Sequence, residues 1–225
     1  MEQRVNPSEK KVTEFRKRIL KWFKTNSREF PWRGHNRSAY ELLVAEILLQ
    51  RTRAENVVNV YLDFIEKYPN FRKLSEAKIS ELEYLLKPIG LYRSRSRNLV
   101  KLGKLLLDTE GGLEARTELK SLPGVGPYIA NTFLLIAFNK RLGAVDTNVR
   151  RLYGRVFSVK SRTDAGGDER VWKFAGEMLP HRRYKEFMLA ILDFSALVCK
   201  KKSPKCDSCA LNDICDCYEN RNLQI

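Results

Sequence analysis

The amino-acid sequence predicts an all-α protein built from packed helices. Apolar residues recur about every three or four positions along most of the 225 residues, which is the period of a helix with one buried face. Glycines and prolines interrupt this pattern between the periodic stretches. No alternating run of β-branched residues is long enough to predict a sheet. With 43% hydrophobic residues the chain can bury a packed core, as one large domain or two small ones.

The first helix is expected over about 8–25, where the buried stripe is formed by Val12, Phe15, Ile19, Trp22 and Phe23. A loop over 28–38 follows, because proline and glycine interrupt the helical pattern there. Further helices are expected over about 39–51, 54–67, 76–87, 93–108, 115–121, 127–139, 147–157, 169–179 and 183–198.

Glycine and proline also mark boundaries between these helices. Gly90 is placed to end the helix over 76–87, since glycine readily adopts the left-handed conformation found after a helix. Pro127 opens a helix at the position where its missing N–H costs least. The stretch 160–168, rich in serine, glycine and charge, predicts a surface connection.

The charge of the chain points to a polyanionic partner. Lysine and arginine number 42 against 27 acidic residues, which leaves a formal net charge of +15. Nucleic acid or an acidic membrane surface would suit such a field. No stretch approaches the roughly 20 apolar residues of a membrane span, and the charged N-terminus lacks the apolar core of a signal peptide. We therefore expect a cytoplasmic protein that binds nucleic acid and no membrane.

Four cysteines near the C-terminus share a spacing that is typical of a metal centre. Cys199, Cys206, Cys209 and Cys215 are separated by six, two and five residues. Short loops of this kind bring four sulfurs together at little entropic cost. A [4Fe–4S] cluster suits the lopsided spacing better than zinc, which usually takes two tight cysteine pairs. On spacing alone, two disulfides or a zinc knuckle stay open.

The segment LPGVG at 122–126 predicts a tight turn between two helices. Gly124 and Gly126 let the backbone turn sharply and approach a ligand closely. The turn ends at a helix N-terminus, where free N–H groups favour an anion such as a DNA phosphate. Asp146 follows Gly126 by 20 residues and precedes the next helix. On sequence alone Asp146 is either a helix cap or a functional carboxylate.

Together, FPWR at 30–33, the hairpin, Asp146 and the cysteine spacing resemble the helix–hairpin–helix DNA glycosylases of the endonuclease III superfamily. The resemblance covers nearly the whole chain. It implies a six-helix barrel domain with the hairpin over 30–140, and a second helical domain from 1–29 and 141–225. The second domain would carry a [4Fe–4S] cluster on the four cysteines, with the active site in the cleft between the domains. Two departures are a loop before Asp146 without proline and an extra thiol at Cys217.

The resemblance also implies the reaction. Bifunctional members of the superfamily have a lysine two residues after the hairpin, where it forms an imine with the sugar; this chain has Tyr128. A phenol, with a reference pKa of about 10, cannot form an imine. We therefore expect a monofunctional glycosylase with little or no lyase activity, in which Asp146 stabilises positive charge on the deoxyribose.

A second carboxylate, Glu46, lies in an otherwise apolar helix, where an unpaired charge is costly. One interpretation is a glutamate on the exposed face. The segment also resembles the helix of mismatch-directed adenine and thymine glycosylases whose glutamate faces the target base. That resemblance assigns Glu46 to contacting the flipped base or the attacking water, as a general acid.

The target base is predicted from finer positions. Ala54 and Leu189 resemble the corresponding residues of archaeal G·T and G·U mismatch glycosylases, and would leave a pocket for a C5-methyl group. Adenine glycosylases tend to have valine and glutamine there, and they carry a C-terminal domain for which these 225 residues leave no room. Thymine or uracil opposite guanine is the expected target. Adenine excision from A·G or A·8-oxoguanine, or a non-catalytic iron–sulfur DNA-binding protein, are the alternatives.

The resemblance also implies how the expected partner, double-stranded DNA with a mismatched or deaminated base, would be contacted by a monomer associated with a prokaryotic nucleoid. Arg51 would fill the vacated stack, the adjacent Gln50 would also contact DNA, and Leu91 would wedge between base steps. Gly124, Gly126 and the cluster of Arg93, Arg95 and Arg97 would meet phosphates. A second backbone contact is expected from Lys200, Lys201, Lys202 and Lys205.

Overall fold

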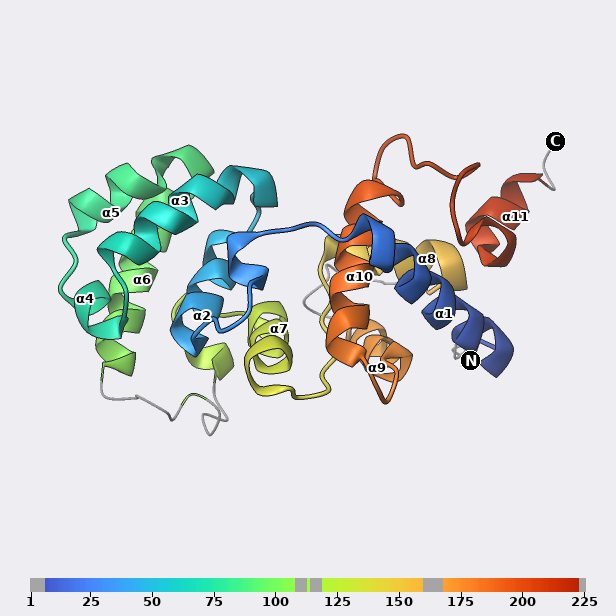
Figure 1. Ribbon diagram of the computed structural model, residues 1–225, viewed down its shortest axis with the longest axis horizontal. Coiled ribbons are helices and arrows are strands. Elements are labelled where there is room, and N and C mark those ends of the chain that lie inside the picture. The colour runs from blue at the N-terminus through green and yellow to red at the C-terminus, as the bar shows by residue number, and fades with distance from the viewer. Residues whose placement is uncertain (1–6, 108–112, 114–118, 160–167, 223–225) are drawn as a thin grey trace. The chain divides into compact units, whose positions relative to one another are not determined.

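The structure is a computed structural model, and it describes residues 7–107, 113, 119–159 and 168–222 (Figure 1). Every regular element in these residues is a helix, which confirms the predicted all-α fold. The α-helices are α1 (Glu9–Asn26), α2 (Ala39–Leu48), α3 (Ala54–Lys67), α4 (Phe71–Ser75), α5 (Ile79–Leu86), α6 (Tyr92–Leu106), α7 (Pro127–Phe138), α8 (Thr147–Phe157), α9 (Glu169–Met178), α10 (Tyr184–Leu197) and α11 (Asp216–Asn222). Short 3₁₀ helices are η1 (Pro31–Arg33), η2 (Lys87–Ile89), η4 (Leu119–Ser121) and η5 (Asn212–Ile214).

The chain divides into two compact units. The middle unit is Glu29–Lys140, and the terminal unit joins Met1–Arg28 to Arg141–Ile225. The domain boundaries expected from the sequence, 29/30 and 140/141, lie within one residue of these. The assignment of the units as a barrel domain and a cluster domain stays a prediction.

The core of the middle unit is built around α2, which is apolar on nearly all sides. Its Leu43, Val44, Ile47 and Leu48 are buried, and the helix packs against α3 and α7. On the other side of the unit α6 packs against α4 and α5. Gly103 of α6 lies so close to α4 that a Cβ there would be 2.7 Å from the backbone nitrogen of Ser75, so a larger residue would force the helices apart.

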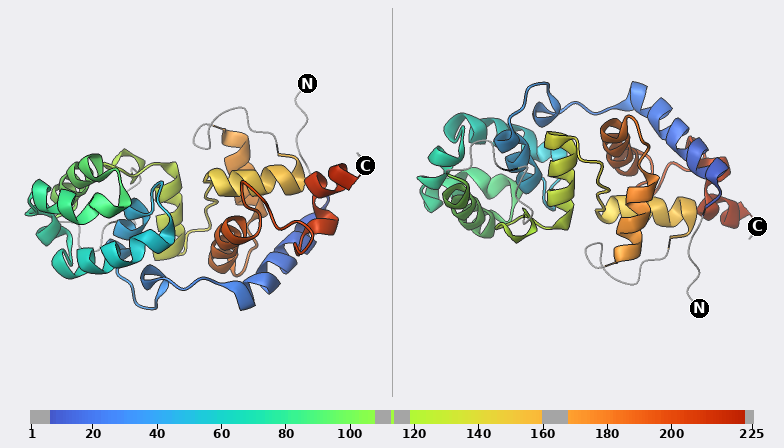
Figure 2. Two further views of the ribbon diagram at one scale, coloured as in Figure 1. Left: turned by 90° about the horizontal axis from the view of Figure 1, so that it is seen from above. Right: turned by 90° about the horizontal axis from the view of Figure 1, so that it is seen from below.

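The core of the terminal unit is an aromatic cluster formed by residues far apart in the sequence. Phe15 of α1 meets Phe157 of α8 edge-on, with ring centroids 5.0 Å apart, and it also contacts Phe187 of α10. Tyr153 and Phe174 complete the cluster. Figure 2 shows α1, in blue, lying with the orange and red C-terminal helices, and α1 packs along α10. Such edge-to-face pairs stabilise a core beyond their buried area.

The observed helices differ from the expected ones in a few places. The helix expected over 39–51 ends at Leu48, and Arg51 adopts a left-handed backbone conformation with φ of 55°. The short helices α4 and α11 were not predicted. Of the helix expected over 115–121, only η4 lies in the described residues, and the connection over 160–168 lies outside them except for Asp168. None of the described helices is long and apolar enough to span a membrane.

A buried ion pair fixes the end of the first segment of the terminal unit. The side chain of Asp193 on α10 is fully buried, and its Oδ1 accepts from Nε of Arg28 at 2.7 Å. The backbone N–H of Arg28 donates to Oδ2 at 2.9 Å. This carboxylate therefore anchors the chain where it leaves α1.

We expect Asp193→Ala to lower the free energy of unfolding of the terminal unit by about 3–5 kcal/mol, because it leaves a guanidinium without its buried carboxylate. The matched control is Glu186→Ala on the same helix, whose surface pair with Arg183 should contribute at most about 1 kcal/mol. Urea unfolding followed by circular dichroism measures both. Equal losses for the two variants would contradict the anchoring role.

Candidate active site and cysteine-lined cavity

The predicted hairpin is present as a turn between η4 and α7 in the middle unit. Val125 N–H donates to the carbonyl of Leu122 at 3.0 Å, and Gly124 has a φ of +79°, a conformation that favours glycine. A Cβ on Gly124 would lie 3.4 Å from Nδ2 of Asn98, so the turn also packs tightly on α6. Gly126 precedes α7 and has no side chain that could cap it. The first N–H groups of α7 are therefore suited to an external anion.

The loop after α2 is tied to this hairpin. Nε2 of Gln50 donates to the carbonyl oxygen of Gly124 at 2.7 Å, across 74 residues of sequence. Arg51, the next residue, is exposed and left-handed. A non-glycine residue adopts this conformation only when its surroundings hold it there, which is common at functional loops.

The loop before α6 presents an exposed apolar side chain. Leu91 is 48% exposed and has a φ of 52°, directly after Gly90 with a φ of 69°. Gly90 ends η2, whereas the helix over 76–87 that it was predicted to end is α5, which already stops at Leu86. Arg93 is exposed, and its guanidinium lies 5.7 Å from the ring centre of Tyr92. Arg51, predicted to fill the vacated stack, and Leu91, predicted to wedge between base steps, are thus both exposed and both have a left-handed backbone conformation.

One residue of the expected phosphate-binding cluster does not belong to it. Arg95 is only 3% exposed, and its guanidinium donates to backbone carbonyls of Gln50, Ile89 and Gly90. The prediction that Arg95 meets phosphate is therefore wrong, because its donors are used inside the protein. Arg93 and Arg97 are exposed, as that prediction requires.

Glu46 lies on the buried part of α2. It is 9% exposed and surrounded along the helix by buried apolar residues, so the interpretation as an exposed-face glutamate is wrong. Tyr128 is half-buried in the first turn of α7, against the core of the same unit. Because α2 and α7 pack together, Glu46 and Tyr128 are carried by neighbouring helices. Ala54 begins α3 and is also half-buried against this core.

Asp146 is the N-cap of α8 in the terminal unit. Its Oδ1 accepts from the backbone N–H of Asn148 at 2.8 Å and from that of Val149 at 2.6 Å, while Oδ2 accepts from Nδ2 of Asn148 at 3.0 Å. The cap interpretation is therefore correct, and it leaves the half-buried carboxylate in a fixed orientation. Leu189, the other residue predicted for the base pocket, is half-buried on α10.

Asn148 and Arg151, which were not predicted from the sequence, extend the hydrogen bonds of Asp146. Oδ1 of Asn148 accepts from Nη1 of Arg151 at 2.8 Å, and Arg151 donates onward to the carbonyl oxygens of Cys199 and Ser195, each at 2.8 Å. The spacing of three between Asn148 and Arg151 places both on one face of a helix, and that signal was available in the sequence. A chain of hydrogen bonds thus runs from Asp146 to the backbone of the first cysteine.

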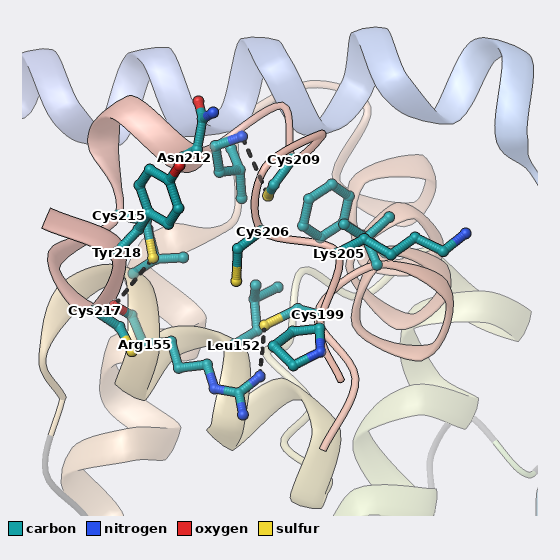
Figure 3. Close-up of a pocket in the computed structure, with 15 residues that line it drawn as sticks. Leu152, Arg155, Cys199, Lys205, Cys206, Cys209, Asn212, Cys215, Cys217 and Tyr218 are labelled. Atoms are coloured by element: carbon teal, nitrogen blue, oxygen red, sulfur yellow. Dashed lines mark hydrogen bonds between the residues drawn. The ribbon is translucent and has the colours of Figure 1, made fainter. Parts of the chain in front are cut away.

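The cysteines line one cavity in the terminal unit (Figure 3). It has a volume of about 30 Å³ and lies between α8, which contributes Leu152 and Arg155, and the loop after α10. All five cysteines of the chain line it, and none of them forms a disulfide. The four lysines of this loop, Lys200, Lys201, Lys202 and Lys205, are exposed as expected.

Individual donors reach the cysteine sulfurs. The backbone N–H of Leu211 lies 3.4 Å from Sγ of Cys209, and Nη1 of Arg155 lies 3.5 Å from Sγ of Cys199. Burial, together with the neighbouring thiols, raises the pKa of Cys209 to about 11 and also raises that of Cys215. In the described part of the chain, no three His, Cys, Asp or Glu side chains are arranged to hold one metal ion.

Comparison with known proteins places this chain among DNA repair enzymes. Residues 44–176 match the profile of the family described as HhH-GPD superfamily base excision DNA repair protein. The chain is 37% identical to a thymine/uracil-DNA glycosylase of Pyrobaculum aerophilum, over 93% of this chain and 94% of that protein. Its fold is similar to that of a thermostable thymine-DNA glycosylase, with a TM-score of 0.86 and 34% identity. The match covers 94% of this chain and 98% of that protein. It is also similar to endonuclease III in a non-covalent complex with DNA, with a TM-score of 0.83 and 28% identity. This match covers 97% of this chain and 100% of that protein.

Proposed function

We propose that this chain, which belongs to the HhH-GPD superfamily of base excision DNA repair proteins, is a monofunctional glycosylase that removes thymine or uracil mispaired with guanine. It is a DNA glycosylase of base excision repair. The observation that carries the finer proposal is that the chain has both a fixed carboxylate and no amine for lyase chemistry. The carboxylate is Asp146, held at the start of α8, and a phenol, Tyr128, occupies the hairpin position where a lyase would have an amine.

Binding begins at the DNA backbone. The partner is double-stranded DNA containing the mismatched base, bound by one copy of the chain. The net charge of +15 attracts the duplex, and the N–H groups at the start of α7 suit one phosphate. Arg93 and the exposed lysines of the cysteine loop add sequence-independent contacts.

The target nucleotide is then extruded, because a glycosylase cannot reach the glycosidic bond of a stacked base. Leu91 enters between base steps and unstacks them. Arg51 fills the space that the base leaves and donates to the unpaired guanine, whose O6 and N7 suit a guanidinium. Their exposure on left-handed loops supports both roles.

Asp146 then stabilises the positive charge that develops on the deoxyribose as the glycosidic bond breaks. Its hydrogen bonds to two backbone N–H groups and to Nδ2 of Asn148 hold the carboxylate in one orientation, so little reorganisation is needed in the transition state. Glu46 contacts the flipped base, to which it would donate a proton as a general acid, or the attacking water, from which it would accept one. Tyr128 offers no amine, so water attacks the sugar carbon, the glycosidic bond is hydrolysed, and the strand stays intact with an abasic sugar.

The target base is assigned from two side chains and from the relatives. Neither Ala54 of the middle unit nor Leu189 of the terminal unit has an amide that could bind an adenine edge. The relative from Pyrobaculum aerophilum, which matches nearly end to end, is a thymine/uracil-DNA glycosylase. Adenine excision is the lesser alternative.

Cys199, Cys206, Cys209 and Cys215 would hold a [4Fe–4S] cluster. Their chemistry suits such a group, because all four are free thiols that line one cavity, although no three of them are arranged to hold a metal ion as they stand in the described residues. The N–H donors of Leu211 and Arg155 are placed to stabilise thiolates. When bound, the cluster would supply iron–thiolate bonds that cross-link the basic loop. The loop residues then present their lysines to DNA.

The reaction itself is tested on a duplex with one G·T pair. We expect thymine to be released and the strand to stay intact until alkali cuts it at the abasic site. Borohydride should trap no protein on the DNA, whereas Tyr128→Lys should be trapped, because an amine would then face the sugar. Efficient trapping of the parent protein would contradict the monofunctional assignment.

The role of Asp146 is tested by two substitutions that separate the cap from the charge. Asparagine caps a helix about as well as aspartate, so Asp146→Asn should keep its stability but lose roughly a hundredfold or more of the single-turnover excision rate. Asp146→Ala should lose the same activity and about 1 kcal/mol of stability as well. Excision by Asp146→Asn at nearly the parent rate would reduce the residue to a helix cap.

The cluster is tested by the colour and metal content of the purified protein. We expect a brown protein with broad absorption at roughly 400 nm, from iron bound by thiolates. Cys206→Ser should lose this colour and bind DNA more weakly. The matched control Cys217→Ser should keep both, because Cys217 lies outside the ligand spacing. A colourless parent with one zinc per chain would overturn the assignment.

A further inference from the structure

Arg95 of α6 is a buried charge whose partners are all neutral. It is 3% exposed, and among the described residues its guanidinium contacts only backbone carbonyl oxygens, while its Nε has no partner. Burial lowers the pKa of this guanidinium from its ordinary value. Burying a charge without a carboxylate is costly, so an apolar residue would serve a purely packing role better.

The carbonyl groups that Arg95 contacts lie at two particular places. Nη2 donates to the carbonyl oxygen of Gln50 at 2.9 Å, and Nη1 donates to that of Gly90. These are the peptide groups directly before Arg51 and Leu91. Both of these exposed residues have left-handed backbone, which is unfavourable for L side chains unless neighbouring contacts hold it. One guanidinium therefore holds the backbone at both strained positions.

Further hydrogen bonds join the same loops to the hairpin. Oγ1 of Thr52 donates to the carbonyl oxygen of Ile89 at 2.9 Å, which links the two loops a second time. The side chain of Gln50 donates to the carbonyl oxygen of Gly124 at 2.7 Å. The loops over 50–52 and 89–91 and the hairpin over 122–126 thus form one connected network, with Arg95 at its centre.

We propose that Arg95 is a positioning residue that holds Arg51 and Leu91 together in the conformation that enters the duplex. The proposal rests on the proposed function, in which these two residues fill the vacated stack and wedge between base steps. A guanidinium suits the task because its two terminal nitrogens reach two loops at once in a fixed plane. Loops ordered before binding lose little entropy when they enter the DNA, so base extrusion becomes easier.

The positioning role is measured first in the free protein, by amide hydrogen exchange of Arg95→Met and Arg95→Lys. We expect exchange at 50–53 and 89–92 to rise by about tenfold or more in Arg95→Met, because the hydrogen bonds that hold both loops are lost. Arg95→Lys keeps the charge but reaches fewer carbonyls, so its increase should be smaller. The control is Arg72→Met, the same substitution at an exposed arginine of the same unit, which should leave both loops unchanged.

The consequence for DNA is measured by single-turnover excision from a G·T duplex at saturating enzyme. Arg95→Met should be slower by about tenfold or more, Arg95→Lys should be intermediate, and Arg72→Met should match the parent. Unchanged exchange, or a uniform rise across residues 29–140, would overturn the positioning role. A rise confined to the two loops with normal excision would overturn its part in opening the duplex.

The two proposals fail in different ways. A parent protein that excises no base from any duplex would contradict the proposed function. The exchange comparison needs no DNA, so it would still decide whether Arg95 holds the two loops.

Discussion

The ends of helices are where an all-helical chain keeps backbone groups without partners, and the candidate functional residues of this protein gather there. Asp146 is the N-cap of α8, and Gly126 and Tyr128 lie at the start of α7. Leu91 directly precedes α6, and Arg51 lies in the turn after α2. The first N–H groups of a helix bind anions or orient a carboxylate, and the turns between helices expose single side chains on strained backbone. The same groups that must be satisfied for folding thus supply the proposed chemistry.

Helix α8 connects the two functional features of the terminal unit. Its N-terminus orients Asp146, and its side chains Leu152 and Arg155 line the cysteine cavity. Arg151, between them, joins Asn148 to the carbonyl oxygen of Cys199. A change in the cysteine loop therefore acts on the same helix that orients Asp146, the proposed catalytic carboxylate. The cavity and the carboxylate depend on one element, so a substitution that disturbs the cysteine loop is expected to disturb the orientation of Asp146 as well.

How much could be predicted depended on whether a signal was local. The helical stripes, the hairpin glycines and the cysteine spacing are local patterns, and the structure has helices, a turn and a shared cavity there. The end of α2 could not be predicted, because Gln50 is held by Gly124, 74 residues away. The burial of Arg95 was predictable but missed: residues 93, 95 and 97 cannot share a helix face, whereas Arg95 shares one with the buried Leu99 and Leu102. Spacing by two in a helix should have separated Arg95 from its neighbours.

The central proposal is that this glycosylase, in which the carboxylate of Asp146 is held in one orientation, removes a pyrimidine opposite guanine. Single-turnover excision rates on four duplexes that differ only in one base pair test this claim most directly: G·T, G·U, A·G and A·8-oxoguanine. We expect thymine and uracil to be released from the first two at least about tenfold faster than adenine from the others, which corresponds to roughly 1.4 kcal/mol between transition states. Faster release of adenine would contradict the account.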